Sequence, residues 1–450
     1  YDGSYNGKLI SDANFDYTLK DKVLILSNFT VQGYGAIIRG SGTASESVLD
    51  INLDGKDIDI GRLLVNTDYN VKGYVQAKGH IGGSLYNPNF NGTVTSNLLV
   101  INGEGISNVD GTIYADKTVI NLENLGFDEE NGGRYMARAG MSLVGDKRLF
   151  GTLQITNGRV SNLLALLGKP VDTLDGSLSG TVDLGGTYNN PNINVVGSIN
   201  NVSIDEKVVG DAKVDVALEN RKFKIRTLKL PVDDGLIAAG GTIDLDGDAD
   251  LQIAVRDVDI KPFLPLIGKD IKATGSVTGV INMTGATKNP KVELSASLAN
   301  GSYNGIDIDQ GFVLATMQDH VINVQRIQGA KGDYKLSVYG RIPLAALYTT
   351  GYLDANDSKA MDMTVDFNEA GMAVIPLVTD TVQDATGALK GVVHITGTLD
   401  QPEAYGTVSV RNGTMKIKSL GNDIKNIDGD LIFSGQQGDF QSRISMGKGS

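Results

Sequence analysis

The stretch that decides the fold is GSLSGTVDLGGTYNNP, residues 176–191, because three other parts of the chain repeat it in register. The other copies are GYVQAKGHIGGSLYNP (73–88), GSVTGVINMTGATKNP (275–290) and GALKGVVHITGTLDQP (387–402). Each copy begins with glycine, has another glycine five residues before its end, and ends in proline. Four matches in register indicate a repeat architecture.

Within each copy, apolar residues occupy one parity, and polar or small residues mostly occupy the other. A period of two is that of a β-strand with one apolar face. The Gly-x4-Pro that closes each copy predicts a turn, because proline cannot donate to a sheet ladder and glycine tolerates positive φ. The residues expected on the apolar face are Val75, Ala77 and Ile81; Leu178, Val182 and Leu184; Val277, Ile281 and Met283; and Leu389, Val393 and Ile395.

The remainder of each repeat also alternates. Residues 214–230 place Phe223 and Ile225 on one parity, and residues 241–258 do the same with Ile243 and Leu245, so these four are added to the expected apolar lining. Asn-Gly and Asp-Gly pairs favour two-residue hairpins. They occur at 54–55, 91–92, 102–103, 110–111, 246–247, 300–301, 412–413 and 428–429.

A short apolar element precedes each copy, at 57–65, 158–168, 257–268 and 369–380. The leucines of GRVSNLLALLG suit one or two helical turns, whereas Pro262 and Pro265 limit the third element to a short or irregular turn. We expect short caps against the edge or end of a sheet.

These patterns predict an all-β fold, an elongated repetitive sheet with short capping helices. The expected repeats cover about 66–168, 169–268 and 269–380, with partial repeats at 1–65 and 381–450, as if both ends were cuts through a continuing array. No composition shift marks a linker, so one elongated body is expected over 1–450.

Composition excludes several function classes. The net charge of −13 disfavours nucleic acids and attachment to anionic headgroups through a basic patch. The absence of cysteine removes disulfides, thiolate metal sites and cysteine nucleophiles. No apolar stretch is long enough to cross a bilayer as a helix.

No residue set supports catalysis, a metal or a cofactor. His80 and His394 occupy equivalent outward positions in different repeats, and His320 lies beside the turn-like Gln318-Asp319, so all three are interpreted as surface residues. DLDGDAD (244–250) lacks the length and terminal glutamate of a calcium-binding EF-hand loop, and a hairpin turn explains it better than a weak cation site. The glycines of 176–186 lack the strand-to-helix context of a dinucleotide fingerprint. We therefore expect no enzyme.

A family resemblance rests on three features: the G-x-[LV]-x-[GA]-x-[GVI]-x-[ILM]-x-G-x4-P blocks, the leucine-rich cap before each, and strand-rich connecting sequence such as 111–127. In these features the chain resembles the AsmA-like superfamily and, within it, the TamB family. The resemblance implies a sheet curled into a U-shaped trough with an apolar lining. It also implies an inner-membrane anchor in the parent, a location in the periplasm of a diderm bacterium, phospholipid cargo, and a BamA-type outer-membrane barrel as partner through a region absent here.

Three functions remain open from the sequence. The first is a segment of a bridge that carries phospholipid between the two membranes along an apolar groove. The second is a structural or adhesin-type β-solenoid with a closed, dry core. The third is a chaperone-like module that offers its sheet edge to outer-membrane barrel precursors. The apolar parity by itself does not separate a dry core from an open groove.

Overall fold

The computed structural model describes residues 3–5, 8–33, 35–63, 70–130, 132–166, 168, 170–171, 173–267, 272–303, 306–332, 334–347, 358–377, 381–419 and 423–444. The chain divides into two compact units, Tyr1–Leu228 and Lys229–Ser450. The division falls inside strand β15 (Lys222–Val232), in the middle of the predicted repeat 169–268.

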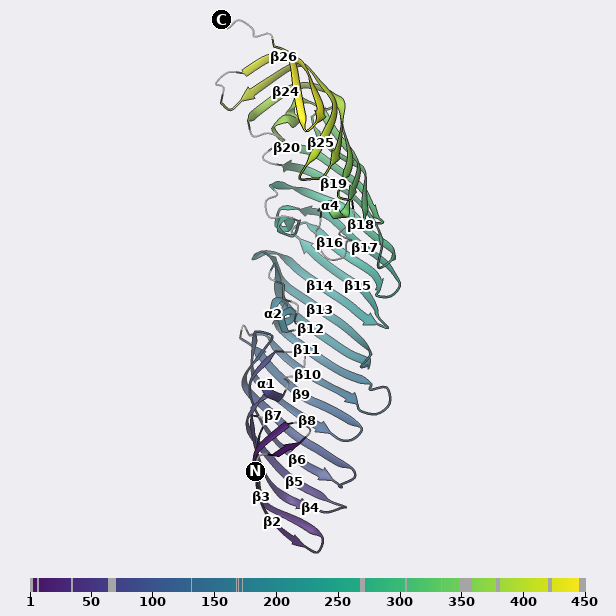
Figure 1. Cartoon of the computed structure of the whole chain (residues 1–450). Helices are drawn as coiled ribbons and strands as arrows, with labels where there is room; N and C mark the ends of the chain where they lie inside the picture. The colour runs from purple at the N-terminus through teal and green to yellow at the C-terminus, as the bar shows by residue number, and fades with distance from the viewer. Residues whose placement is uncertain are drawn as a thin grey trace. The chain divides into compact units, whose positions relative to one another are not determined.

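The first unit is an antiparallel sheet in which each strand pairs with the next along the chain, from β1 to β14 (Figure 1). Tight turns join most of these strands, so neighbours in sequence are neighbours in the sheet. The strands are β1 (Gly3–Tyr5), β2 (Lys8–Lys20), β3 (Val23–Gly33), β4 (Ala36–Ala44), β5 (Leu49–Asp59), β6 (Val71–Gly83), β7 (Pro88–Ile101), β8 (Glu104–Ala115), β9 (Val119–Glu129), β10 (Arg134–Ser142), β11 (Leu149–Arg159), β12 (Leu174–Thr187), β13 (Asn190–Ile204) and β14 (Lys207–Glu219).

The second unit repeats this arrangement from β16 to β27. The predicted all-β class with short helices is confirmed, and the described strands do not close into a barrel. The strands are β16 (Gly235–Asp244), β17 (Asp248–Asp259), β18 (Ala273–Ala286), β19 (Lys291–Tyr303), β20 (Ile306–Gln318), β21 (Val321–Lys331), β22 (Tyr334–Pro343), β23 (Met361–Glu369), β24 (Val382–Gly397), β25 (Pro402–Ile417), β26 (Asp423–Gly435) and β27 (Gln437–Ile444).

The expected caps are present at the ends of the predicted repeats. They are α1 (Ile60–Leu63), α2 (Val160–Leu166), the turn η1 (Lys261–Phe263) with α3 (Leu264–Ile267), and the 3-10 helix η2 (Met372–Leu377). A further helix, α4 (Leu344–Leu347), follows β22. Six strands separate α1 from α2, and six separate α3 from η2. An even number of antiparallel strands returns the chain to the side of the sheet, formed by the strand ends, from which it started. Within each unit the two caps therefore lie on the same side, at the ends of the strands.

The glycines of the repeat adopt conformations that other residues rarely adopt. The glycine before the turn has φ of 84°, 76°, 84° and 82° at Gly83, Gly186, Gly285 and Gly397, which explains its recurrence. The first glycine of each copy also has positive φ and lies at or beside a register shift, as at Gly73. These irregularities recur in successive strands and bend them, because a bulge kinks a strand and increases its twist.

The hairpin prediction is wrong for six of the eight Asn-Gly and Asp-Gly pairs. Only 102–103 and 246–247 lie in turns, and the other six pairs lie inside strands. Asn300 and Asn412 show why, because they have φ near 50° inside β19 and β25. A bulge requires the same left-handed conformation as a tight turn, so a short sequence does not distinguish the two.

Candidate functional site

The second unit carries an unbroken row of apolar residues across nine consecutive strands, β17 to β25. Directly paired residues of antiparallel strands project on the same face of the sheet. Eight apolar side chains and one glycine therefore share one face. The row is Ile253, Ile281, Leu294, Ala315, Val324, Gly340, Met363, Ile395 and Ala404.

The neighbouring row, one residue away along each strand, is polar throughout. Because side chains alternate between faces, this row lies on the opposite side of the same nine strands. These two paired rows therefore lie on opposite faces of the sheet, one apolar and one polar. The row is Gln252, Asn282, Glu293, Thr316, Asn323, Arg341, Asp362, Thr396 and Glu403.

The first unit shows the same apolar face. Leu153, Val182, Val195 and Val216 pair in succession across β11 to β14. Val182 is one of the predicted lining residues, and the register places Leu153, Val195 and Val216 on the same face. A second row crosses β4 to β8 through Gly42, Ile51, Ile81, Phe90 and Ala115.

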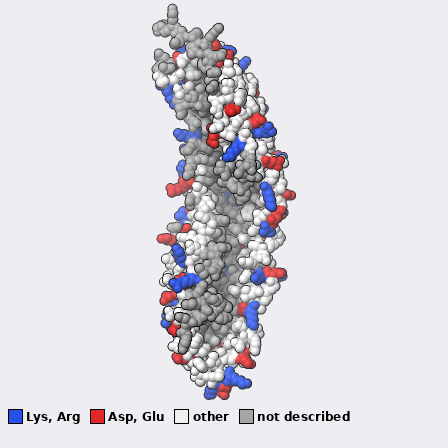
Figure 2. Space-filling view, in the orientation of Figure 1, with Lys and Arg blue, Asp and Glu red and all other residues white. Residues whose placement is uncertain are grey.

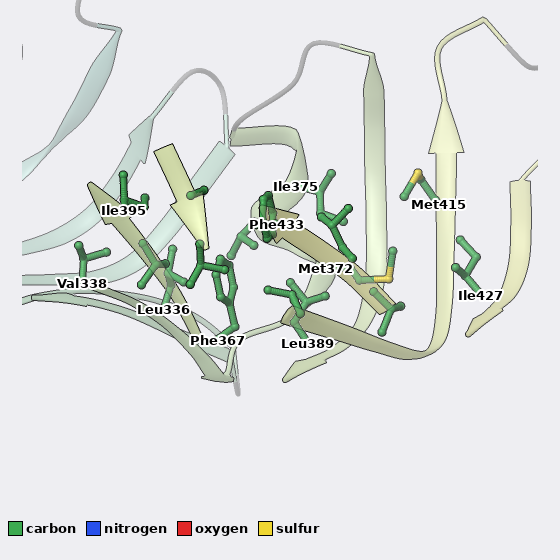
Figure 3. A pocket seen from close by; sticks show the side chains of 17 residues that line it. Leu336, Val338, Phe367, Met372, Ile375, Leu389, Ile395, Met415, Ile427 and Phe433 are labelled. Carbon is green, nitrogen blue, oxygen red and sulfur yellow. The ribbon is translucent and has the colours of Figure 1, made fainter. Parts of the chain in front are cut away.

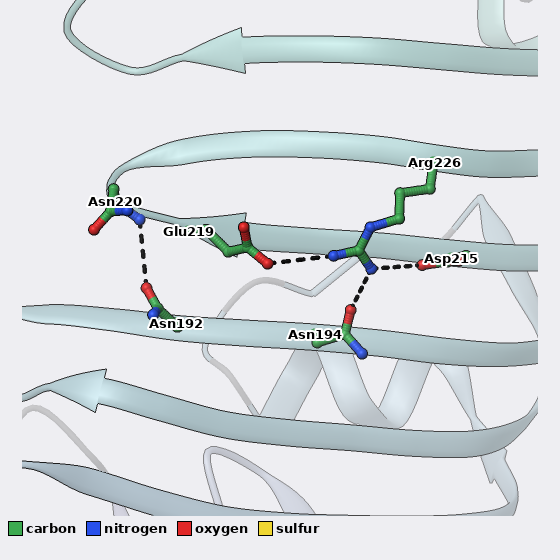
Figure 4. A network of polar contacts seen from close by, with 6 residues as sticks. All are labelled: Asn192, Asn194, Asp215, Glu219, Asn220 and Arg226. Atoms are coloured by element: carbon green, nitrogen blue, oxygen red, sulfur yellow. Dashed lines mark hydrogen bonds and ion pairs between the residues drawn. The ribbon is translucent and has the colours of Figure 1, made fainter.

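Many charged groups lie on the polar face and link neighbouring strands, although the buried carboxylate of Glu129 lies on the apolar side with Tyr135. In the first unit, Arg226 donates to the carboxylates of Asp215 at 3.0 Å and Glu219 at 3.2 Å, and to the amide oxygen of Asn194 (Figure 4). One guanidinium thus joins side chains of β13, β14 and β15. In Figure 2, the red and blue side chains gather mainly along the margins of the view. The residues of the apolar rows named above carry no comparable network.

A cavity of about 770 Å³ lies on the apolar face in the second unit (Figure 3). The 17 side chains that line it are all aliphatic, aromatic or methionine, and they come from β22 to β26 and from η2. The strand residues of the lining include Val365, Val393 and Ile395, and Val393 and Ile395 are among the predicted groove residues. The cavity is therefore part of the apolar face, covered at this point by a cap.

The two residues just before η2 tie it to the sheet. Leu389 N–H donates to the carbonyl of Ala370 at 2.9 Å, and Gly371 forms a β-bridge with Ala388. Met372 is 1% exposed. Its sulfur lies where it would contact a Cβ atom added at Gly387, the first glycine of the fourth copy. In the copy at 275–290, Leu298 of the adjacent strand occupies the corresponding space above Gly275.

The predicted lining residues fall into three groups by burial. Val75, Leu389 and Val393 are buried, and Leu389, Val393 and Ile395 line the cavity. Leu245 is the exception, because it lies in the turn between β16 and β17 and is 46% exposed. The others are half-buried: Ala77, Ile81, Leu178, Val182, Leu184, Phe223, Ile225, Ile243, Val277, Ile281, Met283 and Ile395.

Some lining residues were missed by the sequence analysis. Met372, Val374 and Ile375 were recognised only as part of a cap, and Phe367 and Phe433 were not singled out. Phe367 continues the alternation of Met363 and Val365, which is a signal that could have identified it. Nothing local indicates that η2 and β26 contribute to one cavity, because that depends on the folding of the sheet.

His80 and His394 lie on the polar face, and His320 lies in the turn between β20 and β21. The ring of His80 is hydrogen-bonded to Asp50, with 3.0 Å between Nε2 and Oδ1, and the ring of His394 lies 3.4 Å from the carboxylate of Asp362. Both histidines use the preceding strand as partner, as expected from their equivalent positions. In the described part of the chain, no group of three or more His, Asp or Glu residues is placed to hold a metal.

The largest resolved pKa shifts have structural causes. Burial, together with a hydrogen bond to Glu129, raises the pKa of Tyr135, and the rings of Tyr135 and Phe127 stack with centroids 4.6 Å apart. Hydrogen bonds from the hydroxyl and amide of Thr118 lower the pKa of Asp116 to about 2 in the turn after β8. Neither group faces the cavity.

Comparison with protein families, with curated proteins and with solved structures finds no match to this chain. Over the described ranges, every helix is too short to span a bilayer. The features that bear on function are therefore the apolar face of the sheet and its cavity.

Proposed function

We propose that this chain is a segment of a lipid conduit, in which the apolar face of each unit holds the acyl chains of phospholipids while their headgroups stay in water. The row of paired apolar residues from Ile253 to Ala404 carries the proposal. Most of its equivalents in the first unit, such as Leu178 and Val182, are half-buried. A dry core would bury them, whereas a face that receives hydrocarbon leaves them accessible.

The free energy of the hydrophobic effect suits this role. Each methylene removed from water contributes roughly 0.8 kcal/mol, so an acyl tail gains several kilocalories per mole by lying on an apolar face. The polar row on the other side of the strands stays hydrated, and it keeps the sheet soluble while the apolar side is occupied.

Movement along such a face needs no covalent step. Neighbouring strands present valine, isoleucine, leucine, alanine and glycine at successive positions, so an acyl chain that shifts by one strand exchanges similar contacts for similar contacts. No hydrogen bond to the tail has to break, because these side chains offer none. The direction of movement is set by where lipid is supplied and removed.

The resemblance of the repeat to the AsmA-like superfamily and the TamB family supports the same proposal. It implies a location in the periplasm of a diderm bacterium, in a parent protein anchored in the inner membrane. The partner that this resemblance implies is a BamA-type outer-membrane barrel.

Photo-crosslinking along β12 tests the proposal, because adjacent residues of this strand lie on opposite faces. A photoreactive amino acid is placed in turn at Leu178, Val182 and Leu184, on the apolar face, and at Ser179 and Asp183, on the polar face. The protein is incubated with vesicles of phosphatidylethanolamine and phosphatidylglycerol, one of them radiolabelled. We expect lipid capture at the first three positions only.

Two results would reject the conduit. Absence of capture at all five positions in folded protein favours the closed β-solenoid. Equal capture on both faces means that lipid adheres without using the apolar face. A chaperone-like module instead predicts capture of unfolded barrel strands at the sheet edge, unaffected by charges on the apolar face.

A further inference from the structure

The cavity in the second unit is a part of the apolar face that lies beside the cap η2. Met372, Val374 and Ile375 of η2 line one side, and strands β22 to β26 line the rest (Figure 3). By contrast, none of the described residues of α2 is buried, although α2 occupies the equivalent place in its repeat. Leu166 of α2 also packs against the apolar face of its own unit, but η2 is the cap that lines a cavity of this size among the described residues.

The lining excludes most classes of occupant. None of its side chains carries a nitrogen or oxygen atom, and the backbone groups of the strands are engaged in the sheet ladder. A peptide segment would bring backbone N–H and C=O groups that find no partner here, which is unfavourable in an apolar site. A headgroup or a sugar fails for the same reason. A saturated or unsaturated hydrocarbon chain has no group that needs a partner.

The size and position of the cavity also fit a hydrocarbon chain. A volume of about 770 Å³ is within the range of roughly 300–1,000 Å³ typical of ligand sites, and protein interiors rarely keep large voids unfilled. Ile395 and Ala404 belong both to the lining and to the apolar row that begins at Ile253. A tail that lies along this row can therefore enter the cavity without crossing a polar surface.

We propose that the cavity between η2 and strands β22–β26 is a discrete site for one lipid acyl chain, in which η2 covers the bound chain. This acyl-chain site would be one defined binding site within the proposed lipid conduit, so the inference rests on that proposal. Along the uncovered face, a tail remains accessible and exchanges readily. Beside η2 it is covered in part and contacts more apolar side chains, so the site holds a lipid longer than the flanking strands do.

The first test fills the cavity and measures binding of cis-parinaric acid, a fatty acid that fluoresces in apolar surroundings. Ala404→Phe adds a ring inside the cavity without adding a polar group. Thr407→Phe is the matched control, because Thr407 is exposed on the opposite face of the same strand β25. We expect the first variant to weaken binding at the slowly exchanging site by about tenfold or more, which is about 1.4 kcal/mol, and the second to bind like the unmodified chain.

The second test does not depend on how well the filled variant folds. A photoreactive amino acid is placed at Val374, which lines the cavity, or at Asn368, which is exposed at the end of β23, and the full chain is incubated with radiolabelled palmitic acid. Capture at Val374 and not at Asn368 supports the acyl-chain site. Absence of capture at Val374, or unchanged binding by folded Ala404→Phe, overturns it.

A photoreactive residue at Val182 in the first unit, carried in the same samples, separates this inference from the conduit. Capture at Val182 without capture at Val374 rejects the acyl-chain site and leaves the conduit intact. Absence of capture at both positions rejects both. If Ala404→Phe loses the slowly exchanging binding of cis-parinaric acid but still shows capture at Val182, the acyl-chain site is separate from the rest of the apolar face.

Discussion

Placing the same charge at Val182 and at Val393 distinguishes an open apolar face from a dry core. Each valine stands nine residues before the proline of its copy, so the two occupy equivalent positions in the repeat. Their surroundings differ, because Val182 is half-buried whereas Val393 is 4% exposed and belongs to the cluster under η2. We expect Val182→Arg and Val393→Arg to have unequal effects on stability.

The magnitudes follow from where the guanidinium can go. At Val393 it would be buried without a partner, and an uncompensated buried charge costs about 3–5 kcal/mol. At Val182 the long side chain can lie along its apolar neighbours and place its charge in water, so the cost is about 1 kcal/mol or less. The predicted difference between the two variants is therefore at least about 2 kcal/mol.

Hydrogen exchange of the amides in β12 and β24 is the appropriate assay, since a repetitive sheet need not unfold in one step. Val182→Met and Val393→Met serve as controls that change the shape of the side chain but add no charge. If Val182→Arg destabilises β12 as much as Val393→Arg destabilises β24, the face at β12 is dry and the reasoning behind the conduit is refuted.

Three further predictions concern the framework. Tyr135→Phe removes a buried donor to Glu129, which is 4% exposed, and should lower the free energy of unfolding by about 1–3 kcal/mol in chemical denaturation; no loss would mean that water replaces the hydroxyl. Because the pKa of Asp116 is lowered from 3.8 to about 2 in the folded chain, its carboxylate stabilises the fold above pH 3.8 and ceases to do so as the pH falls through about 2. Asp116→Asn should therefore lower the melting temperature at neutral pH but not below about pH 2, and a difference that is the same at all pH values would contradict this assignment. Gly275→Ala should cost about 2 kcal/mol or more, because Gly275 has a φ of 129° and an added Cβ would lie 2.7 Å from Leu298 Cδ1, whereas Gly329→Ala meets no atom within 4 Å and should be close to neutral. Equal melting temperatures for the two alanine variants would rule out the strained backbone as the reason for the glycine at 275.

The sequence was most informative where the structure depends on local geometry. Alternation predicted the strands of all four copies, and the clustered leucines and the prolines predicted short caps, including the irregular third one at η1 and α3. It failed for six of the eight Asn-Gly and Asp-Gly pairs, because residues such as Asn300 and Asn412 adopt at bulges the same backbone conformation that they would adopt in a hairpin. Several true turns, such as Asp21-Lys22, lack glycine and have positive φ at both residues.

The sequence by itself determined that one face of each strand is apolar, since alternation with a period of two is fixed by the geometry of a strand. Only the tertiary structure decided which part of that face is covered. Val182 and Val393 have the same local pattern, yet one is half-buried and the other is enclosed beneath Met372 and its neighbours. The physical reason is that a residue is covered only if a cap packs over its strand. This depends on the position of the cap and on the register of the strands that follow it, which are long-range properties of the folded sheet.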